Sequence, residues 1–481
     1  MKESIKSIDI LVFDVGSTYT KVTAFAENQG QLLWLARAQA PTTIQDINQG
    51  LSQALIELGK ELESYSITPK HVLSTSSAAG GLRMVAMGYM PRVTAKAAKE
   101  VAMNAGARVL EVMSFEDHVA NKQEMLCEIR PDIILLAGGT DGGDKDSMLT
   151  DAQIIVDSGV KATVVIAGNS DAQADVELLL KKVGIHTVRV SNVMPNIHNL
   201  NVKPAREAIH EEFIHQITKA KGLSKLLDRL TVNKVVPTPG AVLMAAELLA
   251  KGTHEEAGCG SLVVLDLGGA TTDIHSVLPQ LDDLSIEERG LVLTNAKQAT
   301  YRTVEGNLGL RVSARGIVEA MGEKGILARI GLTGEETELA LAGYVASFDE
   351  NPERLPLSCQ EHQFDQALAV AALEVALKRH AGYIAQQFDP IMGTVPGTPI
   401  GRDLRTVDTV IAIGGIFVHL SNEDAEAIVA KAFERPGYSL LPIKPKVVID
   451  RNYLFYTIGL LAEYGSTVAL QFAKAHFGLS D

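Results

Sequence analysis

Short apolar runs separated by glycines and polar turns open the chain. The pattern predicts strands at 8–14, 21–27 and 31–37, a helix at 44–63 and a strand at 70–74. The same β-β-β-α-β order recurs after residue 261, with strands predicted at 261–266, 272–277 and 290–294 and a helical region beginning at 312–321. This recurrence predicts an α/β chain built by duplication of one unit.

Between the two copies, residues 131–200 have an alternation of their own. Continuous apolar runs predict strands at 132–137, 162–167 and 186–190, and helices are predicted between them at 145–158 and 171–183. Strands that alternate with helices favour a parallel sheet with right-handed crossovers. We therefore interpret residues 131–200 as an α/β insertion in the first lobe.

The remaining elements follow from helix boundaries and glycine positions. A helix is predicted at 239–250, because it begins with proline and ends before glycine, and a longer one at 365–388. Residues 393–407 are rich in Gly, Pro and Thr and predict a loop. A strand at 409–413 then ends at paired glycines, and Ser421 is expected to cap a helix that ends near Phe433.

Two segments with the same pattern lie about 250 residues apart, at 13–21 (FDVGSTYTK) and 265–273 (LDLGGATTD). Each places an Asp near the end of an apolar strand, before a glycine turn rich in hydroxyls and a second strand. Such a turn points backbone N–H groups outward together and forms an anion-binding concavity beside a carboxylate. One Asp-x-Gly hairpin alone is also common as a plain β-turn. Two of them, with Gly414-Gly415 after a further strand, favour nucleotide binding.

The hairpins supply most of the candidate site residues. Two carboxylates can hold Mg²⁺ through its waters, because Mg²⁺ takes few protein ligands and keeps much of its hydration. We therefore assign Asp14 and Asp266 to the metal and to catalysis. The residues expected at the nucleotide are Gly16, Ser17, Thr18 and Lys21 in the first hairpin and Gly268, Gly269, Ala270, Thr271 and Thr272 in the second.

Composition narrows the range of functions. A formal charge of −14 and a pI near 5.4 argue against nucleic-acid binding, which depends on clustered Lys and Arg. Cys127, Cys259 and Cys359 lie far apart, which favours a reducing cytosol and gives no zinc or iron–sulfur framework. No apolar run reaches the roughly 18 residues that span a bilayer, and no signal-like segment precedes Asp14. We expect a cytoplasmic protein without nucleic-acid or membrane partners.

The three glycine segments resemble the phosphate-1, phosphate-2 and adenosine motifs of the actin, Hsp70 and sugar kinase ATPase superfamily. Residues 236–249 (VPTPGAVLMAAELL) are similar to the connecting segment of that superfamily. The resemblance implies two lobes, 1–235 and 236–481, with a duplicated ribonuclease-H-like core and Mg-ATP in the cleft between them. It also implies that Gly414, Gly415 and Ile416 lie against the adenosine.

Within that superfamily the chain most resembles the MutL family of accessory proteins of glutamate mutase, over essentially its full length. The segments that carry this likeness are 74–84 (STSSAAGGLRM), 135–143 (LLAGGTDGG), 302–309 (RTVEGNLG) and 401–404 (GRDL). The resemblance implies a reactivating chaperone that uses ATP to expel damaged cobalamin. Its partner would be an adenosylcobalamin-dependent amino-acid mutase. The oligomeric state stays open, with a homodimer among the alternatives.

The chain departs from the superfamily at the residue expected to activate water. Hsp70-type members carry a carboxylate just before the Pro-Thr of the connecting segment, where this chain has Val236. Asp141 is the best substitute, because its glycine-rich loop follows strand 132–137 where open α/β sheets bind ligands. Gly138, Gly139 and Thr140 of the same loop become candidate nucleotide contacts. The alternative is a flexible turn with a solvated Asp141.

Glu305 is a second catalytic candidate, and it could equally cap a turn or pair with Arg302 or Arg311. Without the missing carboxylate, either another group activates water or hydrolysis is slow. A missing base does not exclude activity, since positioning and charge stabilisation dominate phosphoryl transfer. A small-molecule kinase with Asp141 as base is the alternative function. The Asp273-x-His275 pair begins like a cobalamin-binding motif, but Leu278 stands where that motif has glycine, so we do not expect the chain to carry cobalamin itself.

Overall fold

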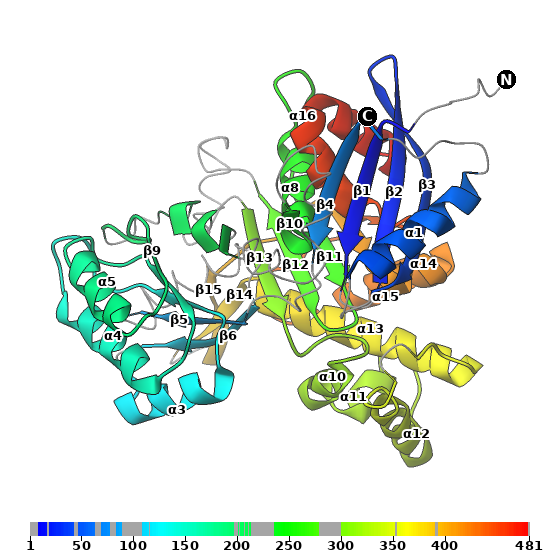
Figure 1. Ribbon diagram of the computed structural model, residues 1–481. Coiled ribbons are helices and arrows are strands. Elements are labelled where there is room, and N and C mark those ends of the chain that lie inside the picture. The colour runs from blue at the N-terminus through cyan, green and yellow to red at the C-terminus, as the bar shows by residue number, and fades with distance from the viewer. Residues whose placement is uncertain are drawn as a thin grey trace. The chain divides into compact units, whose positions relative to one another are not determined.

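The computed structural model describes residues 8–16, 19–42, 47–62, 69–76, 83–88, 108–114, 116–196, 201, 203–205, 207–209, 211–212, 235–278, 300–351, 354–389 and 393–479. The chain divides into two compact units (Figure 1). One comprises Met1–Asn28 and Leu33–Gly240, and the other comprises Gln29–Leu32 and Ala241–Asp481. Each unit is a mixed α/β structure with its own hydrophobic core.

The first unit contains a five-stranded sheet in the order β10-β4-β1-β2-β3. Its strands are β1 (Ile10–Val15), β2 (Tyr19–Asn28), β3 (Gln31–Pro41), β4 (His71–Ser76) and β10 (Val235–Pro237). Strand β1 runs antiparallel to β2 and parallel to β4, and all six of its residues are buried. Helix α1 (Ile47–Glu61) packs against β2. These elements confirm the predicted β-β-β-α-β order.

A second sheet in the same unit has the order β6-β5-β7-β8-β9, and every strand pair in it is parallel. Its strands are β5 (Arg83–Met87), β6 (Arg108–Met113), β7 (Ile133–Leu136), β8 (Thr163–Ile166) and β9 (Thr187–Arg189). Helices α3 (Val119–Ile129), α4 (Asp146–Ser158) and α5 (Gln173–Lys182) accompany it (Figure 1). The alternation predicted over 131–200 is confirmed, and the sheet also takes in β5 and β6, which precede that range.

The second unit repeats the arrangement of the first sheet in the order β13-β12-β11-β16-β17. Its strands are β11 (Leu262–Leu267), β12 (Thr272–Val277), β13 (Thr300–Glu305), β16 (Thr409–Ile413) and β17 (Lys446–Ile449). Strand β11 is antiparallel to β12 and parallel to β16, just as β1 is antiparallel to β2 and parallel to β4. The predicted strand 290–294 lies outside the described residues, and β13 takes the third position of this sheet.

Eight helices among the described residues belong wholly or mainly to the second unit. They are α8 (Thr238–Lys251), α10 (Ala314–Met321), α11 (Glu323–Leu327), α12 (Glu335–Ala346), α13 (Cys359–His380), α14 (Gly415–His419), α15 (Asn422–Phe433) and α16 (Phe455–Phe477). Helix α13 packs across β11, β12 and β13, and its buried face forms the centre of the core. The Ser421 side chain accepts from the Asp424 N–H, which confirms the predicted cap of α15. Among the described residues, no helix is long and apolar enough to cross a membrane.

Two sequence predictions in this unit are wrong. Helix α13 ends at His380, and the residues predicted to continue it form strand β14 (Tyr383–Asp389). The predicted loop 393–407 begins with strand β15 (Gly393–Ile400), which pairs antiparallel with β14. A Cβ on Gly382 would lie 2.4 Å from the Ile400 carbonyl oxygen, so the backbones approach too closely for a side chain. This long-range contact ends the helix where local spacing does not.

Candidate functional site

The first Asp-x-Gly hairpin buries its carboxylate among three side chains. Asp14 lies near the end of β1 with 1% of its surface exposed. Lys21 stands directly opposite it on β2, and the lysine Nζ lies 3.0 Å from Oδ2. The hydroxyls of Thr75 and Thr238 donate to Oδ1 at 2.9 and 2.8 Å. The Asp14 carboxyl is therefore held in place, and most of its acceptor capacity is used within the protein.

The second hairpin has the same backbone geometry. In the first, the amide of Gly16, two residues after Asp14, donates to the carbonyl of Tyr19 at 3.0 Å. In the second, the amide of Gly268, two residues after Asp266, donates to the carbonyl of Thr271 at 2.9 Å. Both glycine amides therefore close their turns, and only the residues at the tips can present amides to an anion. Ser17 and Thr18, at the first tip, lie outside the described residues.

A Cβ on Gly16 would lie 2.6 Å from the Tyr19 carbonyl oxygen, which explains why this turn needs glycine. The tip of the second turn is fixed from outside the hairpin. The carbonyl of Gly269 accepts from the amides of Arg311 and Val312, at 2.9 Å each. The Thr272 hydroxyl donates to the Leu308 carbonyl at 2.6 Å. The loop after β13 thus holds Gly269, Ala270 and Thr271 in place.

The two hairpins differ in the charge opposite the first Asp. In the first hairpin, Lys21 stands opposite Asp14. The corresponding residue of the second hairpin is Asp273, which stands directly opposite Asp266. Asp273 is buried, and Arg302 Nη2 lies 3.3 Å from its Oδ1. Burial raises the pKa of Asp273, although the charge of Arg302 opposes that rise. The second hairpin therefore carries two carboxylates where the first carries an ion pair.

The paired glycines after β16 lie against the second hairpin. Gly414 has φ of +130°, and a Cβ there would lie 2.2 Å from the carbonyl oxygen of Leu267. Helix α14 begins at the next residue, Gly415, and Ile416 packs on the core from its first turn. The structure therefore brings together the predicted phosphate-2 and adenosine residues on neighbouring strands β11 and β16.

Asp141 joins the loops that follow three parallel strands. Its Oδ1 accepts from the Ser170 amide and from Asn192 Nδ2, both at 2.9 Å, and its own amide donates to the Pro195 carbonyl at 3.0 Å. Burial acts to raise the pKa of Asp141, but the hydrogen bonds from Asn192 and Ser170 outweigh it and lower the pKa. Asp141 is therefore held by hydrogen bonds from two neighbouring loops, and the lowered pKa makes its carboxylate a weaker base.

The glycines beside Asp141 allow the tight loop that lets Asp141 bridge its neighbouring loops by hydrogen bonds. Gly139 has φ of +66°, and a Cβ there would lie 2.3 Å from the Asp144 carbonyl oxygen. Asn169 Nδ2 donates to the carbonyls of Gly143 and Asp144 at 3.1 and 3.0 Å, and the Gly138 carbonyl accepts from the Asn169 amide at 2.8 Å. Thr140 accepts from the Gly143 amide at 2.9 Å. The loop is tightly cross-linked.

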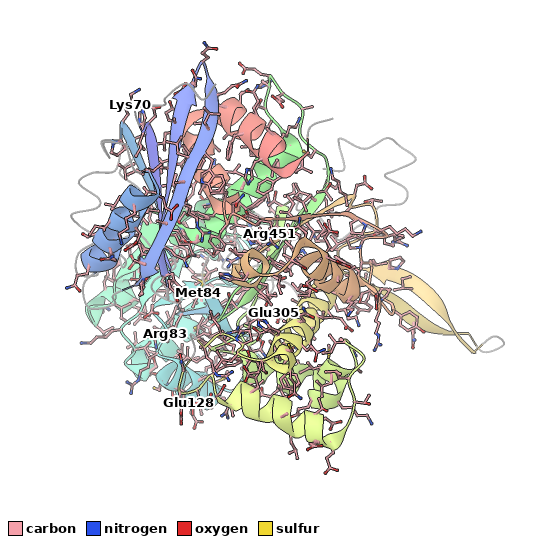
Figure 2. All side chains as sticks on the ribbon, turned by 90° about the vertical axis from the view of Figure 1, so that its right-hand side faces the viewer. Lys70, Arg83, Met84, Glu128, Glu305 and Arg451 are labelled. Atoms are coloured by element: carbon pink, nitrogen blue, oxygen red, sulfur yellow. The ribbon has the colours of Figure 1, made fainter. Side chains whose placement is uncertain are left out.

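Glu305 lies at the end of β13 (Figure 2). Its Oε2 lies 2.5 Å from Nη1 of Arg379 on α13. The two partners considered from the sequence are engaged with other carboxylates. Arg302 faces Asp273, and Arg311 forms a two-pronged pair with Asp365 at 3.0 and 2.6 Å. The ion-pair partner that the structure gives Glu305 is thus Arg379, which the sequence did not single out.

Comparison with known proteins decides the family. The family model described as MutL protein matches residues 10–477. The chain is 41% identical over 458 residues to Protein MutL of Clostridium tetanomorphum, which covers 94% of this chain and 96% of that protein. The chain belongs to the MutL family. It is thus a homologue of the accessory proteins that its motifs resemble.

Solved structures similar to this MutL-family protein include nucleotide-free acetone carboxylase, with a TM-score of 0.38, 13% identity and coverage of 95% of this chain and 70% of that one. Plasmodium falciparum glycerol kinase with ADP has a TM-score of 0.36 and 8% identity, covering 100% and 94% of the two chains. ROK hexokinase from Thermus thermophilus has a TM-score of 0.27 and 10% identity, covering 97% and 99%. At these scores the description of the fold rests on its own strand order.

Sequence reasoning did not assign a role at the hairpins to three side chains of this MutL-family protein, those of Thr75, Thr238 and Asp273. Thr75 donates to Asp14 from β4, the parallel neighbour of β1, and Thr238 donates from the residue that follows β10, the strand on the far side of β4. Val236, which replaces the expected carboxylate, is buried on β10 two residues before Thr238. Asp273 lies within the quoted second segment. It follows Asp266 by seven residues, as Lys21 follows Asp14, and this equal spacing was the signal that could have identified it as a site residue. A hydroxyl just after a buried strand was the available signal for Thr238.

The donor set fits a metal held mainly through water. Among the described residues, no group of three or more His, Cys, Asp and Glu side chains could enclose a metal ion. Asp14 contacts three side chains, and the half-buried Asp266 stands beside a turn whose tip is fixed. Mg²⁺ requires few direct protein ligands, so Asp266 with retained waters suits this ion.

Proposed function

We propose that this MutL-family protein binds Mg-ATP at its two Asp-x-Gly hairpins and hydrolyses it slowly. We further propose that it thereby reactivates an adenosylcobalamin-dependent amino-acid mutase of the glutamate mutase type. The observation that carries the proposal is the equal geometry of the two hairpins. In each hairpin, the amide of the glycine two residues after the Asp closes the turn. The residue seven positions after the Asp stands opposite it on the second strand. Family membership supports the choice of partner.

In this proposal each residue of the hairpins has a defined task. Amides at the turn tips, Gly269 and Ala270 in the second hairpin, bind phosphate oxygens, because the Gly268 amide is already used. Asp266 orients the water shell of the metal. Lys21 balances the charge of Asp14 and can move toward phosphate when one binds. Bound Mg²⁺ would neutralise charge on the transferred phosphoryl group.

In this proposal Glu305 is retained as a catalytic candidate, whereas Asp141 is not used as a base. Glu305 stays a candidate for positioning water, since it ends β13, which pairs with hairpin strand β12. Asp141 would be needed as base by the alternative function, a small-molecule kinase. Its lowered pKa and its hydrogen bonds to Ser170 and Asn192 argue against that use. The accessory function is therefore favoured.

The proposed setting is the cytosol, a reducing compartment. Among the described residues, none of Cys127, Cys259 and Cys359 forms a disulfide. Secreted proteins more often pair their cysteines in disulfides. The proposed partner is a protein, so ATP turnover should respond to the mutase and not to a sugar or a carboxylate.

The proposal is tested by reactivation. Glutamate mutase inactivated with hydroxocobalamin is incubated with the full chain, Mg-ATP and adenosylcobalamin, and the recovery of mutase turnover is measured. We expect recovery with the wild type and little with Asp266→Asn. Asp408→Asn, at an exposed site before β16, is the matched control and should behave as the wild type. Absence of recovery together with absence of a protein complex would contradict the proposed partner.

A further inference from the structure

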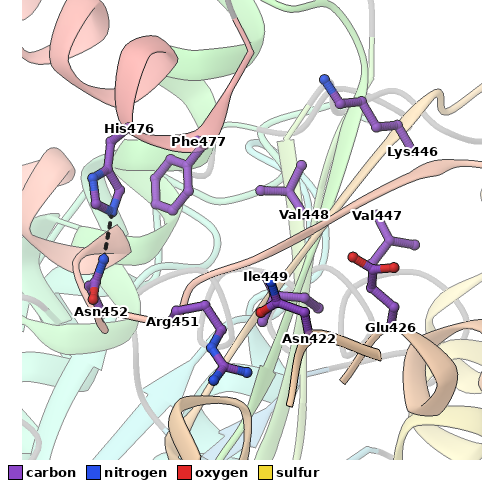
Figure 3. Close-up of a pocket in the computed structure, with 10 residues that line it drawn as sticks. All are labelled: Asn422, Glu426, Lys446, Val447, Val448, Ile449, Arg451, Asn452, His476 and Phe477. Atoms are coloured by element: carbon purple, nitrogen blue, oxygen red, sulfur yellow. Dashed lines mark hydrogen bonds between the residues drawn. The ribbon is translucent and has the colours of Figure 1, made fainter. Parts of the chain in front are cut away.

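The tip of the second hairpin is bonded to the loop after β13, residues 306–313. This loop leads into α10, which packs with α11 and α12 on α13 (Figure 1). A cavity of about 300 Å³ also lies in the second unit, beside strand β17 (Figure 3). None of the residues that line this cavity belongs to the hairpin or to the loop after β13, so the two features are separate.

The contacts at the tip fix the direction of one amide. The Gly269 carbonyl accepts from the amides of Arg311 and Val312, at 2.9 Å each. In a trans peptide the N–H points opposite to the carbonyl, so the Ala270 N–H points away from the loop. A Cβ on Gly309 would lie 2.2 Å from the Ala270 carbonyl carbon, which shows how closely the two backbones pack. The loop therefore aims the amide that the proposed function assigns to phosphate.

The side chain of Arg311 anchors this loop to α13. Its Nη1 and Nη2 donate to Oδ1 and Oδ2 of Asp365 at 3.0 and 2.6 Å, and its Nε donates to the Arg354 carbonyl at 3.1 Å. The Arg311 side chain is 16% exposed and that of Asp365 is 9% exposed, so solvent screens the pair weakly. The guanidinium also lies over the Phe348 ring, 4.9 Å from its centroid. These contacts leave the Arg311 backbone little freedom to move.

Helix α12 holds the carboxylate of this pair. The Tyr344 hydroxyl donates to Asp365 Oδ1 at 2.9 Å. Burial and the Asp365 charge raise the pKa of Tyr344, so the hydroxyl keeps its proton and stays a donor. Contacts thus run without a break from α12 and α13 through Arg311 to the hairpin tip.

A second arginine pair on α13 has similar bonds but does not lead to the hairpin. Arg329 donates to both oxygens of Glu374 at 2.7 and 2.9 Å, and its side chain is 15% exposed. The backbone amide of Arg329 bonds to the Ile326 carbonyl of α11, whereas that of Arg311 bonds to Gly269 of the hairpin. If both pairs served stability alone, replacing either arginine would have the same consequences.

We propose that Arg311 is a positioning residue of the nucleotide site. Its pair with Asp365 holds the amides of residues 311 and 312 on the Gly269 carbonyl and thereby aims the Ala270 amide at a phosphate group. The inference rests on the proposed binding of Mg-ATP at the hairpins. It adds that phosphate binding depends on α12 and α13, neither of which contains a predicted site residue.

Titration calorimetry of the full chain with Mg-ATP compares Arg311→Met with Arg329→Met. We expect Arg311→Met to bind about tenfold or more weakly, because the amide is no longer held toward phosphate, and Arg329→Met to bind as the wild type. Urea melts should show a similar loss of stability in both variants. Without nucleotide, hydrogen exchange at residues 266–273 should be faster in Arg311→Met and unchanged in Arg329→Met.

Two further variants keep the test independent of the folding of Arg311→Met. Asp365→Asn removes the charge and one of the two acceptors, and it should weaken Mg-ATP by about threefold or more. Arg311→Lys keeps a cation opposite Asp365 and should bind more tightly than Arg311→Met.

The inference alone is overturned if the wild type binds Mg-ATP and a folded Arg311→Met or Asp365→Asn binds it equally well. It is also overturned if Arg329→Met loses as much affinity as Arg311→Met, since the effect would then be one of general stability. If the wild type itself does not bind Mg-ATP, the proposed function fails and this inference fails with it.

Discussion

Replacing Asp141 by Asn tests whether this carboxylate serves to bridge neighbouring loops or acts as a catalytic base. Asp141 Oδ1 accepts two hydrogen bonds, from Ser170 and Asn192. Asparagine keeps an oxygen at that place, loses the charge and carries an NH2 group in place of the second carboxylate oxygen. Hydrogen bonds to a charged group are worth about 1.5–3 kcal/mol and neutral ones about 0.5–1.5 kcal/mol. The difference is about 2 kcal/mol for two bonds, and solvent screening at this exposed site reduces it to about 1 kcal/mol.

The assay pairs urea unfolding with steady-state ATP hydrolysis. We expect Asp141→Asn to unfold more easily by about 1 kcal/mol and to hydrolyse ATP within about threefold of the wild type. Because the pKa of Asp141 is lowered on folding, the stability difference should be full above the ordinary Asp pKa of 3.8 and fade as pH falls below it. Asp157→Asn, with one exposed contact on α4, is the control.

A general base contributes about 10²–10⁴-fold to a rate. If Asp141→Asn lowered hydrolysis by that factor with unchanged stability, the bridging interpretation would be refuted, and the kinase-like role of Asp141 would return.

Further predictions concern the hairpins and their neighbours. Thr238→Val removes a hydroxyl that donates to buried Asp14, so urea melts should show a free energy of unfolding lower by about 2 kcal/mol. Calorimetry should show weaker binding of Mg-ATP. Gly414→Ala should cost about 3 kcal/mol or more, because the new Cβ overlaps backbone. Gly437→Ala, with open space around it, should cost about 1 kcal/mol in the same melt. Glu305→Gln should cost at most about 1 kcal/mol, and a larger fall in ATP turnover than in stability would mark it as catalytic.

The hairpins could be predicted from sequence because their signal is local. The strand, the Asp and the turn glycine fall within nine residues, and both predicted hairpins formed with the expected partners. The same holds for the cap of α15, where Ser421 and Asp424 are three residues apart. Local steric rules and short-range hydrogen bonds fix such features before the rest of the chain is considered.

Features that depend on distant contacts were not predicted. Thr238 donates to Asp14 across 224 residues of sequence, and no local pattern encodes that approach. The end of α13 depends on Gly382 meeting the Ile400 backbone, while residues 383–388 continue a pattern that also suits a helix. Asp141 was assigned as a base from its glycine neighbours, yet its partners come from loops after two other strands. Tertiary packing decides these cases.

The most direct test of the account is the binding of Mg-ATP to the full chain, measured by titration calorimetry for the wild type, Asp266→Asn and Asp408→Asn. We expect the wild type and Asp408→Asn to bind Mg-ATP. The affinity of Asp266→Asn should be lower by about tenfold or more, because the half-buried carboxylate beside the turn is lost. Equal affinity of all three would contradict the assignment of the second hairpin. Absence of Mg-ATP binding to the wild type would contradict the nucleotide site itself.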